Sequence, residues 1–598
     1  MRYRTVASLL GAAILTIAAP AAVPADVTPA RVIVVSSIAQ LQSAADQAVA
    51  GDRIELVDGT YTTSGSITLR RSGTATAPIT VAAQNVGGAE IRGTSGFSFS
   101  NADFVVVEGF RFTHSGTITI PGGSEHVRFT RNVVQLSGGT NWVTVTGNDA
   151  EVDHNTFQNK STQGVFLQIA GPGGDDMAQR TWIHHNYFHN HTFDGSNGGE
   201  SIRLGLSFRQ LASAFATVEF NLFDHADGDS EAISVKSSDN VVRFNTLRNT
   251  RGSIVLRHGN RNLVEGNLML GGTAGLRFYD NDHVLINNVI QGGTGQIIAG
   301  SGDIADDTTG STSHARPDRV VVAFNTVVGN RTALLQVGQG TDRLGPNQCT
   351  FANNIFVGGG SGGLLDVDEA TGTTWQGNIV WAGTGGNAPS SGYRVVNPLL
   401  VTDPGGLNRL SSGSPAINAA AGDVPRAGRD FDLQTRSDLK DVGADEFVPG
   451  NAPRRPLTTA DVGPNAGAEP PQANRFEAES ATIFHGVVEA NHAGFTGTGF
   501  VNSDNEIGSY VEWTVTAAAA GPATLTFRFA NGTTANRPMD ITVNGALAAD
   551  ELSFPGTGAW TTWQTRSVTA SLTAGANTVR ATGTTANGGP NLDHLAIG

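Results

Sequence analysis

The sequence contains few cysteines and few charged residues, and each shortage excludes a class of protein. Cys349 is the single cysteine among 598 residues, so an intrachain disulfide is impossible and a cysteine-based zinc site is disfavoured. We expect Cys349 to be a small buried apolar residue. Charged residues make up only 15% of the chain, whereas glycine occurs 76 times. This composition favours short strands and tight turns over long amphipathic helices.

Basic residues and long hydrophobic runs are also scarce. The formal net charge is −15, which weighs against nucleic acid as the main partner. Beyond the N-terminus no apolar run approaches the length of a membrane span, so no membrane partner is expected. At the N-terminus, Arg2 and Arg4 precede an apolar stretch from about Val6 to Ala19 and a small-residue site at 23–25. Residues 1–25 are therefore predicted to be a signal peptide, and the protein to be secreted and extracellular.

A repeat built around asparagine occupies the middle of the chain. Each repeat has an apolar residue, two others, an asparagine and then a pair that is mostly apolar. The asparagines are Asn132, Asn155, Asn186, Asn221, Asn245, Asn267, Asn288, Asn325, Asn354 and Asn378. Many steps lie near 22 residues, and the longest reaches 37, between Asn288 and Asn325. A period near 22 with occasional insertions predicts a parallel β-helix, in which the asparagines stack along one turn.

The remaining segments complete an all-β, two-domain chain. The β-helix is predicted over residues 30–447, with a helix between Ser37 and Val49 covering its N-terminal end and Asp441–Phe447 closing the region. Residues 448–474 are rich in proline, alanine and glycine, which is typical of a linker. From 475 to 598 the apolar and polar residues alternate between turn signals, which predicts a β-sandwich.

Candidate catalytic residues gather on successive coils. Asp229 and Glu231 are two apart on a predicted strand, so both carboxylates point to one face. Lys236 follows five residues later, and Arg257 comes 21 residues after Lys236, about one coil. Adjacent rungs lie about 4.8 Å apart, so Lys236 and Arg257 are expected to be neighbours. Asn197 falls on the equivalent part of the preceding coil.

Three oxygen ligands beside a lysine and an arginine suit β-elimination on a uronate sugar. A base removes the C5 proton, and the C4–O bond to the next sugar breaks. Calcium bound by Asn197, Asp229 and Glu231 would neutralise the uronate carboxylate and stabilise the intermediate. Lys236 is the candidate base, and calcium and Arg257 are expected to lower its pKa. Arg257 is the candidate for stabilising developing charge and protonating the leaving oxygen.

These residues lie in three motifs that resemble polysaccharide lyase family 6, which contains alginate lyases and chondroitinase B. The motifs are Asn-Gly-Gly-Glu-Ser-Ile-Arg-Leu-Gly (197–205), Asp-Ser-Glu-Ala-Ile-Ser-Val-Lys-Ser-Ser (229–238) and Leu-Arg-His-Gly-Asn (256–260). The resemblance covers about residues 35 to 447. It implies a right-handed parallel β-helix, Asn197, Asp229 and Glu231 as calcium ligands, Lys236 as Brønsted base and Arg257 as Brønsted acid. Asp229 differs from the family pattern, which usually has glutamate there.

Neighbouring residues are candidates for contacting substrate. They are His258, Arg203, Glu200, Arg277 and Tyr279, and a plain structural role is the alternative for each. His258, for example, can instead orient Arg257. A second histidine group has a spacing that fits alternation on a strand and turn better than a closed zinc site, so we expect it to be structural. Its members are His184, His185, His189 and His191.

The C-terminal segment resembles carbohydrate-binding modules of families 35 and 6. The resemblance rests on Phe476-Glu477-Ala478-Glu479-Ser480, Tyr510-Val511-Glu512-Trp513, Trp560-Thr561-Thr562-Trp563 and Asn591-Leu592-Asp593-His594. It implies a structural calcium near Glu477, Glu479 and Asp593 and a loop site for a sugar ring. Trp560, Asn531 and Asn591 are the candidates for that loop site, with core or turn positions as the alternative.

The main prediction is a monomeric, calcium-assisted lyase that cleaves an acidic polysaccharide, with alginate favoured because the sequence has no obvious basic cluster for sulfate groups. Dermatan sulfate or a chondroitin-type glycan is the alternative substrate. Two other classes stay open: a glycoside hydrolase that uses Asp229 and Glu231 as its acid pair, and a non-catalytic glycan-binding solenoid. A flanking lysine and arginine have no obvious task in a hydrolase.

Overall fold

The computed structural model describes residues 29–338, 343–450, 454–466, 475–496, 499–517 and 520–597. The predicted signal peptide lies outside these residues. The chain divides into two units, Met1–Ala466 and Gly467–Gly598, and each is described by itself. Within the described residues, no helix combines the length and the hydrophobicity needed to cross a membrane.

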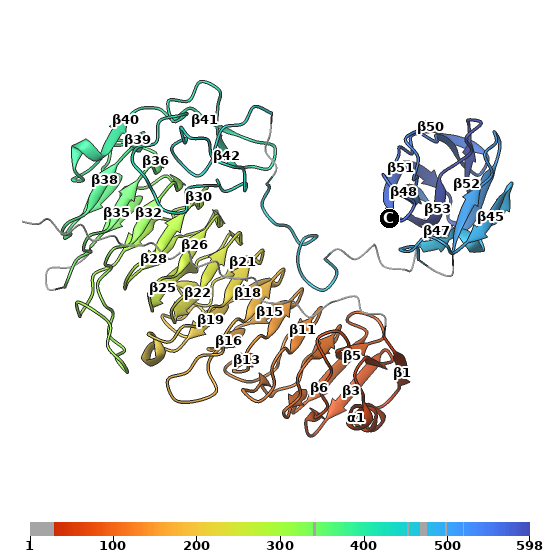
Figure 1. The fold of residues 1–598 in the computed structure, drawn as a ribbon, viewed down its shortest axis with the longest axis horizontal. Helices are drawn as coiled ribbons and strands as arrows, with labels where there is room; N and C mark the ends of the chain where they lie inside the picture. Colours follow the sequence, from red (N-terminus) through yellow and green to blue (C-terminus); the bar gives the residue numbers. More distant parts are fainter. Residues whose placement is uncertain are drawn as a thin grey trace, which may run out of the picture. The chain divides into compact units, whose positions relative to one another are not determined.

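The first unit is a parallel β-helix with three long sheets (Figure 1). One 14-stranded sheet runs from β1 (Arg31–Val35) to β38 (Thr374–Gln376), and the other runs from β3 (Gly59–Thr63) to β40 (Tyr393–Val395). The third sheet, which we call the site sheet, has twelve strands. Along the solenoid they are β4 (Ile67–Leu69), β7 (Phe97–Phe99), β10 (Ile118–Ile120), β13 (Val143–Val145), β16 (Leu167–Ile169), β19 (Ile202–Gly205), β22 (Glu231–Lys236), β25 (Ser253–His258), β28 (Leu276–Phe278), β31 (Ile297–Ala299), β34 (Leu335–Val337) and β37 (Leu365–Val367). The predicted solenoid is therefore confirmed.

Stacked asparagines form one turn of nearly every coil. Each of the ten predicted asparagines is fully buried, and the side-chain N–H of the first nine donates to the Oδ1 of the asparagine in the next coil at 3.0 Å. The residue before each asparagine has a positive φ, as at His154 (52°) and Phe220 (53°). This left-handed residue makes the corner between two sheets, and the ladder satisfies polar groups that the corner buries.

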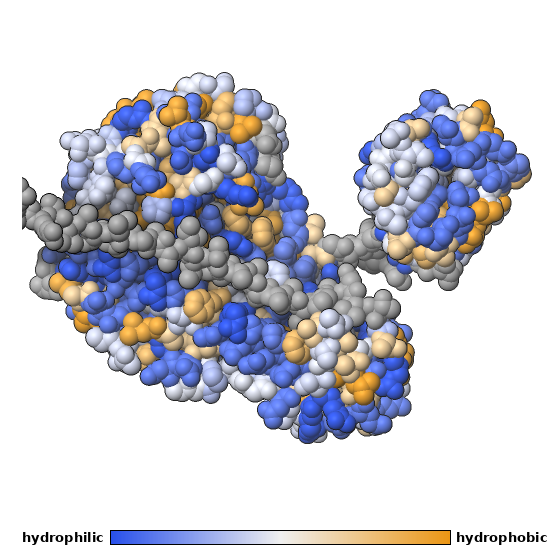
Figure 2. Space-filling view, viewed as in Figure 1, coloured by the Kyte–Doolittle hydropathy of each residue, from blue (hydrophilic) through white to orange (hydrophobic). Residues whose placement is uncertain are grey.

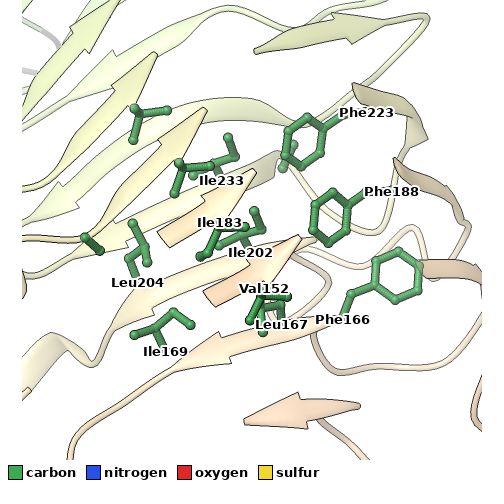
Figure 3. Close-up of a cluster of buried hydrophobic side chains, with 14 of the residues drawn as sticks. Val152, Phe166, Leu167, Ile169, Ile183, Phe188, Ile202, Leu204, Phe223 and Ile233 are labelled. Atoms are coloured by element: carbon green, nitrogen blue, oxygen red, sulfur yellow. The ribbon is translucent and has the colours of Figure 1, made fainter. Parts of the chain in front are cut away.

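Alternating side chains fill the interior of the coils. Ile202 pairs with Ile233 and Leu204 with Val235, and all four are buried. Figure 3 shows Ile183, Ile202 and Ile233 stacked inside the solenoid, with Phe188 and Phe223 in a parallel row. Their ring centroids are 4.9 Å apart. Hydrophilic residues predominate on the visible surface (Figure 2). Because strand residues alternate, burial of Val235 turns Lys236 to the outer face.

The predicted N-terminal helix is present as α1 (Ile38–Gln47). The hydroxyl of Ser37 caps it by accepting a hydrogen bond from the N–H of Gln40 at 3.2 Å. The Gln42 side chain donates to the carbonyl of Thr68 and accepts from its N–H, at 2.9 and 2.8 Å. Thr68 belongs to the edge strand β4, so α1 satisfies backbone groups that an exposed edge would leave open to aggregation.

The predicted linker begins later than the sequence indicates. Within 454–466, the N–H of Gly463 donates to the carbonyl of His185 at 2.8 Å, and the N–H of Leu457 donates to Thr246 Oγ1 at 3.1 Å. Arg454 also bonds to the carbonyl of Gly266. Proline-rich composition was a misleading signal here, because this segment obtains its hydrogen bonds from the turns of the solenoid. Residues 467–474 of the predicted linker lie outside the described part.

The second unit is the predicted β-sandwich. One antiparallel sheet contains β45 (Gly486–Glu489), β46 (Phe500–Ser503), β53 (Asn591–Ile597), β48 (Gly521–Ala530) and β51 (Gln564–Leu572), with β43 (Arg475–Glu477) paired to β53. The other contains β44 (Thr482–Phe484), β47 (Tyr510–Ala517), β52 (Gly575–Gly583), β49 (Met539–Val543) and β50 (Ala546–Leu552). Trp513, Phe527 and Phe529 are buried in its core.

Candidate functional site

Four neighbouring strands of the site sheet place basic side chains on the outer face. Arg203 of β19 is in register with Ser234 of β22, and Arg277 of β28 is in register with Val255 of β25. Lys236 pairs with His258 instead of Arg257, because the register between β22 and β25 shifts after Val235. This bulge leaves Arg257 close enough for its charge to influence Lys236. The predicted neighbourhood of Lys236 and Arg257 is present, but their direct pairing is not.

Lys236 lies in a nearly closed environment beside a buried carboxylate. Its side chain is only 8% exposed, and its Nζ is 3.6 Å from Oε1 of Glu200. Arg203 binds the same carboxylate through two hydrogen bonds of 2.9 and 2.6 Å. Burial lowers the pKa of Lys236, opposed by the charge of Glu200 and assisted by that of Arg203. The predicted direction of this pKa shift is present, but burial is the largest cause.

Two guanidinium groups meet at Glu231. Oε1 of this buried carboxylate accepts hydrogen bonds from Arg257 Nη1 at 3.2 Å and from Arg277 Nη2 at 2.6 Å. Among the described residues, Oε2 is buried without a hydrogen-bond partner, as are the Nε atoms of both arginines. Unpaired buried polar atoms are costly, so this arrangement is suited to a ligand that supplies both positive and negative groups.

The other predicted calcium ligands lie along the same edge. Asp229 Oδ2 accepts from the N–H of Gly199 at 2.8 Å, and its Oδ1 accepts from the N–H of Glu231 at 2.6 Å. Burial raises the pKa of Asp229, and the charge of Glu200 adds to the rise. Asn197 is exposed, two residues before Gly199. The carboxylate oxygens of Asp229 and Glu231 are of the type that binds a hard cation such as calcium, whereas the hydrogen bond found for Asn197 is made by its backbone carbonyl, which accepts from Gln163.

Sequence reasoning missed His314, which forms an aromatic stack with two predicted residues. Its ring lies 4.8 Å from that of His258 and 4.3 Å from that of Tyr279. Burial lowers the pKa of His258 to about 3 and that of His314 to about 4, so both imidazoles are neutral at pH 7. One feature of the sequence could have indicated an inserted segment around His314: the step from Asn288 to Asn325 is 37 residues, longer than the usual coil.

A pair of carboxyl groups holds the inserted segment that carries His314. Asp280 accepts from the N–H of Ala315 at 3.1 Å, and Asp307 accepts from Asn260 Nδ2 at 3.1 Å. Burial raises the pKa of Asp280 to about 9 and that of Asp307 to about 6, and the charge of Asp307 adds to the first shift. Asp280 is therefore protonated at pH 7 and can be buried without a full charge.

The predicted structural histidines make internal contacts. His185 stacks between His154 and Phe220, and His191 bonds to the carbonyl of Gly164 at 2.8 Å. His184 lies beside Asp153 and His154 in a group whose ligand atoms are within 4.8 Å of one another. Arg128 already binds both oxygens of Asp153, at 2.9 and 2.8 Å, which gives that carboxylate a partner without a metal.

In the second unit, the structure brings together only part of the predicted calcium set. Ligand atoms of Glu477 and Asp593 lie within 4.8 Å of each other and of His594. Glu479 is not part of this group, and Arg528 forms an ion pair with Asp593. The group of neighbouring ligand atoms thus contains His594, which follows Asp593 directly, in place of the predicted Glu479.

The predicted sugar-binding residues of the second unit differ in accessibility. Trp560 lies over the backbone of Gly532, where a Cβ would come within 2.5 Å of the indole. Asn531 is fully buried, and its carboxamide donates to the carbonyls of Ala535 and Phe554 and accepts from the hydroxyl of Thr533. Asn591 is also buried, at the start of β53. Asn531 therefore shapes the loop, whereas Trp560 is partly accessible.

A comparison with family models decides the affiliation of the first unit. A model described as chondroitinase B matches residues 35–355, more than half of the chain. The chain belongs to the chondroitinase B family, polysaccharide lyase family 6.

Solved structures include other members of family 6. A mannuronic acid-specific family 6 lyase from the human gut microbiota is 26% identical, with a TM-score of 0.53, over 61% of this chain and 91% of that chain. A family 6 alginate lyase, solved as an arginine-to-alanine mutant, has a TM-score of 0.57 at 24% identity, over 64% of this chain and 55% of that chain. The second likeness shows the fold alone.

The C-terminal part of this family 6 chain has separate relatives. Residues 510–597 match a family model described as the CBM13 domain of alpha-galactosidase. The exo-beta-D-glucosaminidase of Amycolatopsis orientalis is 51% identical over 132 residues, which is 22% of this chain and 13% of that protein. The chain thus spans only a small part of this curated relative. The predicted combination of a family 6 β-helix and a carbohydrate-binding module is confirmed.

Proposed function

We propose that this family 6 chain is a secreted lyase that cleaves alginate by β-elimination. The observation that carries the proposal is the buried amine of Lys236, whose pKa is lowered, on the same outer face as Arg257 and Arg277. A glycoside hydrolase needs two carboxyl groups that flank the scissile bond. Glu231 is instead held by two arginines, which favour its ionised form, and both oxygens of Asp229 accept hydrogen bonds from backbone N–H groups, so the two are not arranged as a free acid pair.

Lys236 is the base in this proposal. Its lowered pKa increases the fraction of neutral amine, which can accept the C5 proton of the uronate. Glu200, just before β19, lies 3.6 Å from the amine of Lys236 and is itself bound by Arg203 of that strand. As the proton leaves C5, the electron pair of the C5–H bond forms the new C4–C5 double bond. The C4–O bond to the next sugar breaks, and its electron pair goes to the departing oxygen. The aromatic stack of His258, His314 and Tyr279 forms an uncharged wall beside this centre.

Arg257 and Arg277 stabilise negative charge on the substrate. Their Nε atoms are buried and unpaired, and both side chains are about 30% exposed or less. In such a position a guanidinium donates two hydrogen bonds to a carboxylate or to a departing oxygen, where the charge of the transition state develops. Calcium, held by Asn197, Asp229 and Glu231, would further neutralise the uronate carboxylate.

The choice of alginate rests on the relatives. One family 6 relative, 26% identical, is named for specificity toward mannuronic acid, a constituent of alginate. The family model, however, is named for a chondroitinase. The carbohydrate-binding module would hold the enzyme on the polymer and raise the local substrate concentration.

A substrate panel tests the proposal directly. The C4–C5 double bond of the product absorbs ultraviolet light, whereas a hydrolase makes none of it. We expect this absorbance to rise with polymannuronate or polyguluronate and to stay flat with dermatan sulfate. A rise with dermatan sulfate alone would show that the substrate is a chondroitin-type glycan and not alginate. New reducing ends without ultraviolet absorbance on any of these polymers would refute the lyase.

Removal of calcium is expected to reduce both activity and thermal stability. A ligand that binds only the folded state stabilises it by about 2.7 kcal/mol at a hundred times its Kd. Calcium added to chelated protein should therefore raise the melting temperature of the β-helix, measured by calorimetry. The variant Glu231→Gln should show a smaller rise, and it leaves the cluster at Asp593 unchanged as an internal control.

Two outcomes would contradict the calcium site. An equal calcium-induced rise in wild type and Glu231→Gln would place the bound ion elsewhere. Full activity in excess chelator would leave neutralisation of the uronate to Arg257 and Arg277, which already contact Glu231.

A further inference from the structure

A cavity of about 250 Å³ adjoins Arg277 on the outer face of the site sheet. Val255 and Ile298 line it with apolar side chains, and Arg251, Arg277 and Arg331 line it with guanidinium groups. Arg277 belongs to this cavity and also binds Glu231. The cavity thus shares one side chain with the catalytic face.

The coil turns explain why arginines converge here. Arg251, Thr273, Thr294 and Arg331 precede strands β25, β28, β31 and β34, so they occupy the same turn in four successive coils. Thr273 Oγ1 donates to the carbonyl of Arg251 at 3.1 Å, and Arg331 Nη1 donates to the carbonyl of Thr294 at 2.9 Å. Two small threonines between two arginines leave a hollow with positive charge at both ends.

Positive charge in this cavity is only partly neutralised. Arg251 pairs with Asp194, and Arg277 pairs with Glu231. The hydrogen bonds found for Arg331 go to the backbone carbonyls of Thr332 and Thr294, so its charge is not shared with a carboxylate among the described residues. The Nε of Arg277 is buried without a hydrogen-bond partner in the part of the chain that the structure describes. The carboxylate of a ligand would pair with the Arg331 guanidinium and accept a hydrogen bond from the Nε–H of Arg277. Such a local positive site would offset the repulsion of anions by the net charge of −15.

We infer that this cavity is a subsite for the uronate next to the one that is cleaved, which rests on the proposed function. Ligand sites for drug-sized molecules begin at about 300 Å³, so the cavity suits one sugar ring. Val255 and Ile298 provide a surface for the C–H face of the ring. Arg331 and Arg277 bind its carboxylate, and Arg251 contributes long-range attraction. Because Arg277 serves both subsites, filling this one aligns the adjacent uronate at Lys236.

The test compares the kinetics of Arg331→Ala and Arg251→Ala on oligouronates of increasing length. On oligomers long enough to fill the cavity, we expect Arg331→Ala to raise KM about fivefold to tenfold. This is the size of effect expected when one partly screened hydrogen bond to a charged group is lost. kcat should change less than about twofold, and the shortest cleavable oligomer should show no change in KM. Arg251→Ala should have a smaller effect, because Asp194 already shares its charge. Arg92→Ala is the matched control, since Arg92 is an exposed arginine on β6 (Ala89–Gly93), outside the site sheet.

Added salt gives a second readout, because screening weakens exposed charge pairs. KM of the wild type should rise with salt more steeply than KM of Arg331→Ala. Equal KM values for wild type and both variants at every length would overturn the subsite, and so would an effect of the same size on the shortest oligomer. Failure of the proposed function is distinguishable, because the wild type itself would then make no unsaturated product.

Discussion

Replacement of Lys236 by alanine is expected to lower kcat by about 10²–10⁴-fold, the contribution of a positioned general base, since the described part of the site offers no second amine to replace it. Unsaturated product formed per second from polymannuronate is the measurement. The fold should survive, because Lys236 lies on the outer face, whereas its neighbours Val235 and Ile233 fill the core. Calorimetry on the same sample provides that control.

Two further variants separate a base from a structural lysine. Lys236→Arg keeps the positive charge beside Glu200 but has no accessible neutral form, so it should be as inactive as Lys236→Ala. Retention of more than a few per cent of activity by either variant would remove Lys236 from the role of base. If Lys236→Arg were active and Lys236→Ala inactive, the role of Lys236 would be to supply positive charge and not to accept a proton.

The pH profile identifies the titrating group. kcat/KM should rise with pH as Lys236 loses its proton, because only the neutral amine accepts the C5 proton. The charge of Glu200 raises the pKa of Lys236, against the lowering effects of burial and of Arg203 and Arg257. Glu200→Gln removes the raising effect, so the ascending limb should move to lower pH. A shift to higher pH, or none, would contradict a base held next to Glu200.

Parts of this site that repeat with the coil were predictable from the sequence. The asparagine period fixed the rungs, and alternation on a strand placed Lys236 and Arg277 on the outer face opposite Val235 and Leu276. Both rules depend on local backbone geometry, which a sequence of short strands specifies well.

Features that depend on irregular segments were not predictable in detail. The bulge in β25 pairs Lys236 with His258, and spacing alone could not distinguish this register from the one with Arg257. His314 comes from an inserted segment whose course is set by Asp280, Asp307 and Asn260, residues far apart in the sequence. The role of Glu200 as the anchor of Arg203 and Lys236 also depends on burial, which the motif does not reveal.

Replacement of Arg257 by alanine is expected to lower kcat by about 10²–10³-fold, the range seen when a preorganised donor to developing negative charge is removed. The amine of Lys236 stays in place, so proton abstraction is possible but the departing oxygen loses its donor. Initial rates on polymannuronate at saturating substrate give kcat, and their dependence on concentration gives KM.

Arg277→Ala is the matched comparison, because both arginines bind the same oxygen of Glu231 and either variant leaves that carboxylate with one partner. Any effect that arises only from loss of a partner for Glu231 should therefore be similar in the two variants. If Arg257 acts on the leaving oxygen, its loss should appear mainly in kcat, whereas loss of Arg277, which holds the uronate, should appear mainly in KM. Equal effects on both constants in both variants would mean that the two guanidinium groups only position Glu231, and the acid side of the mechanism would need another donor.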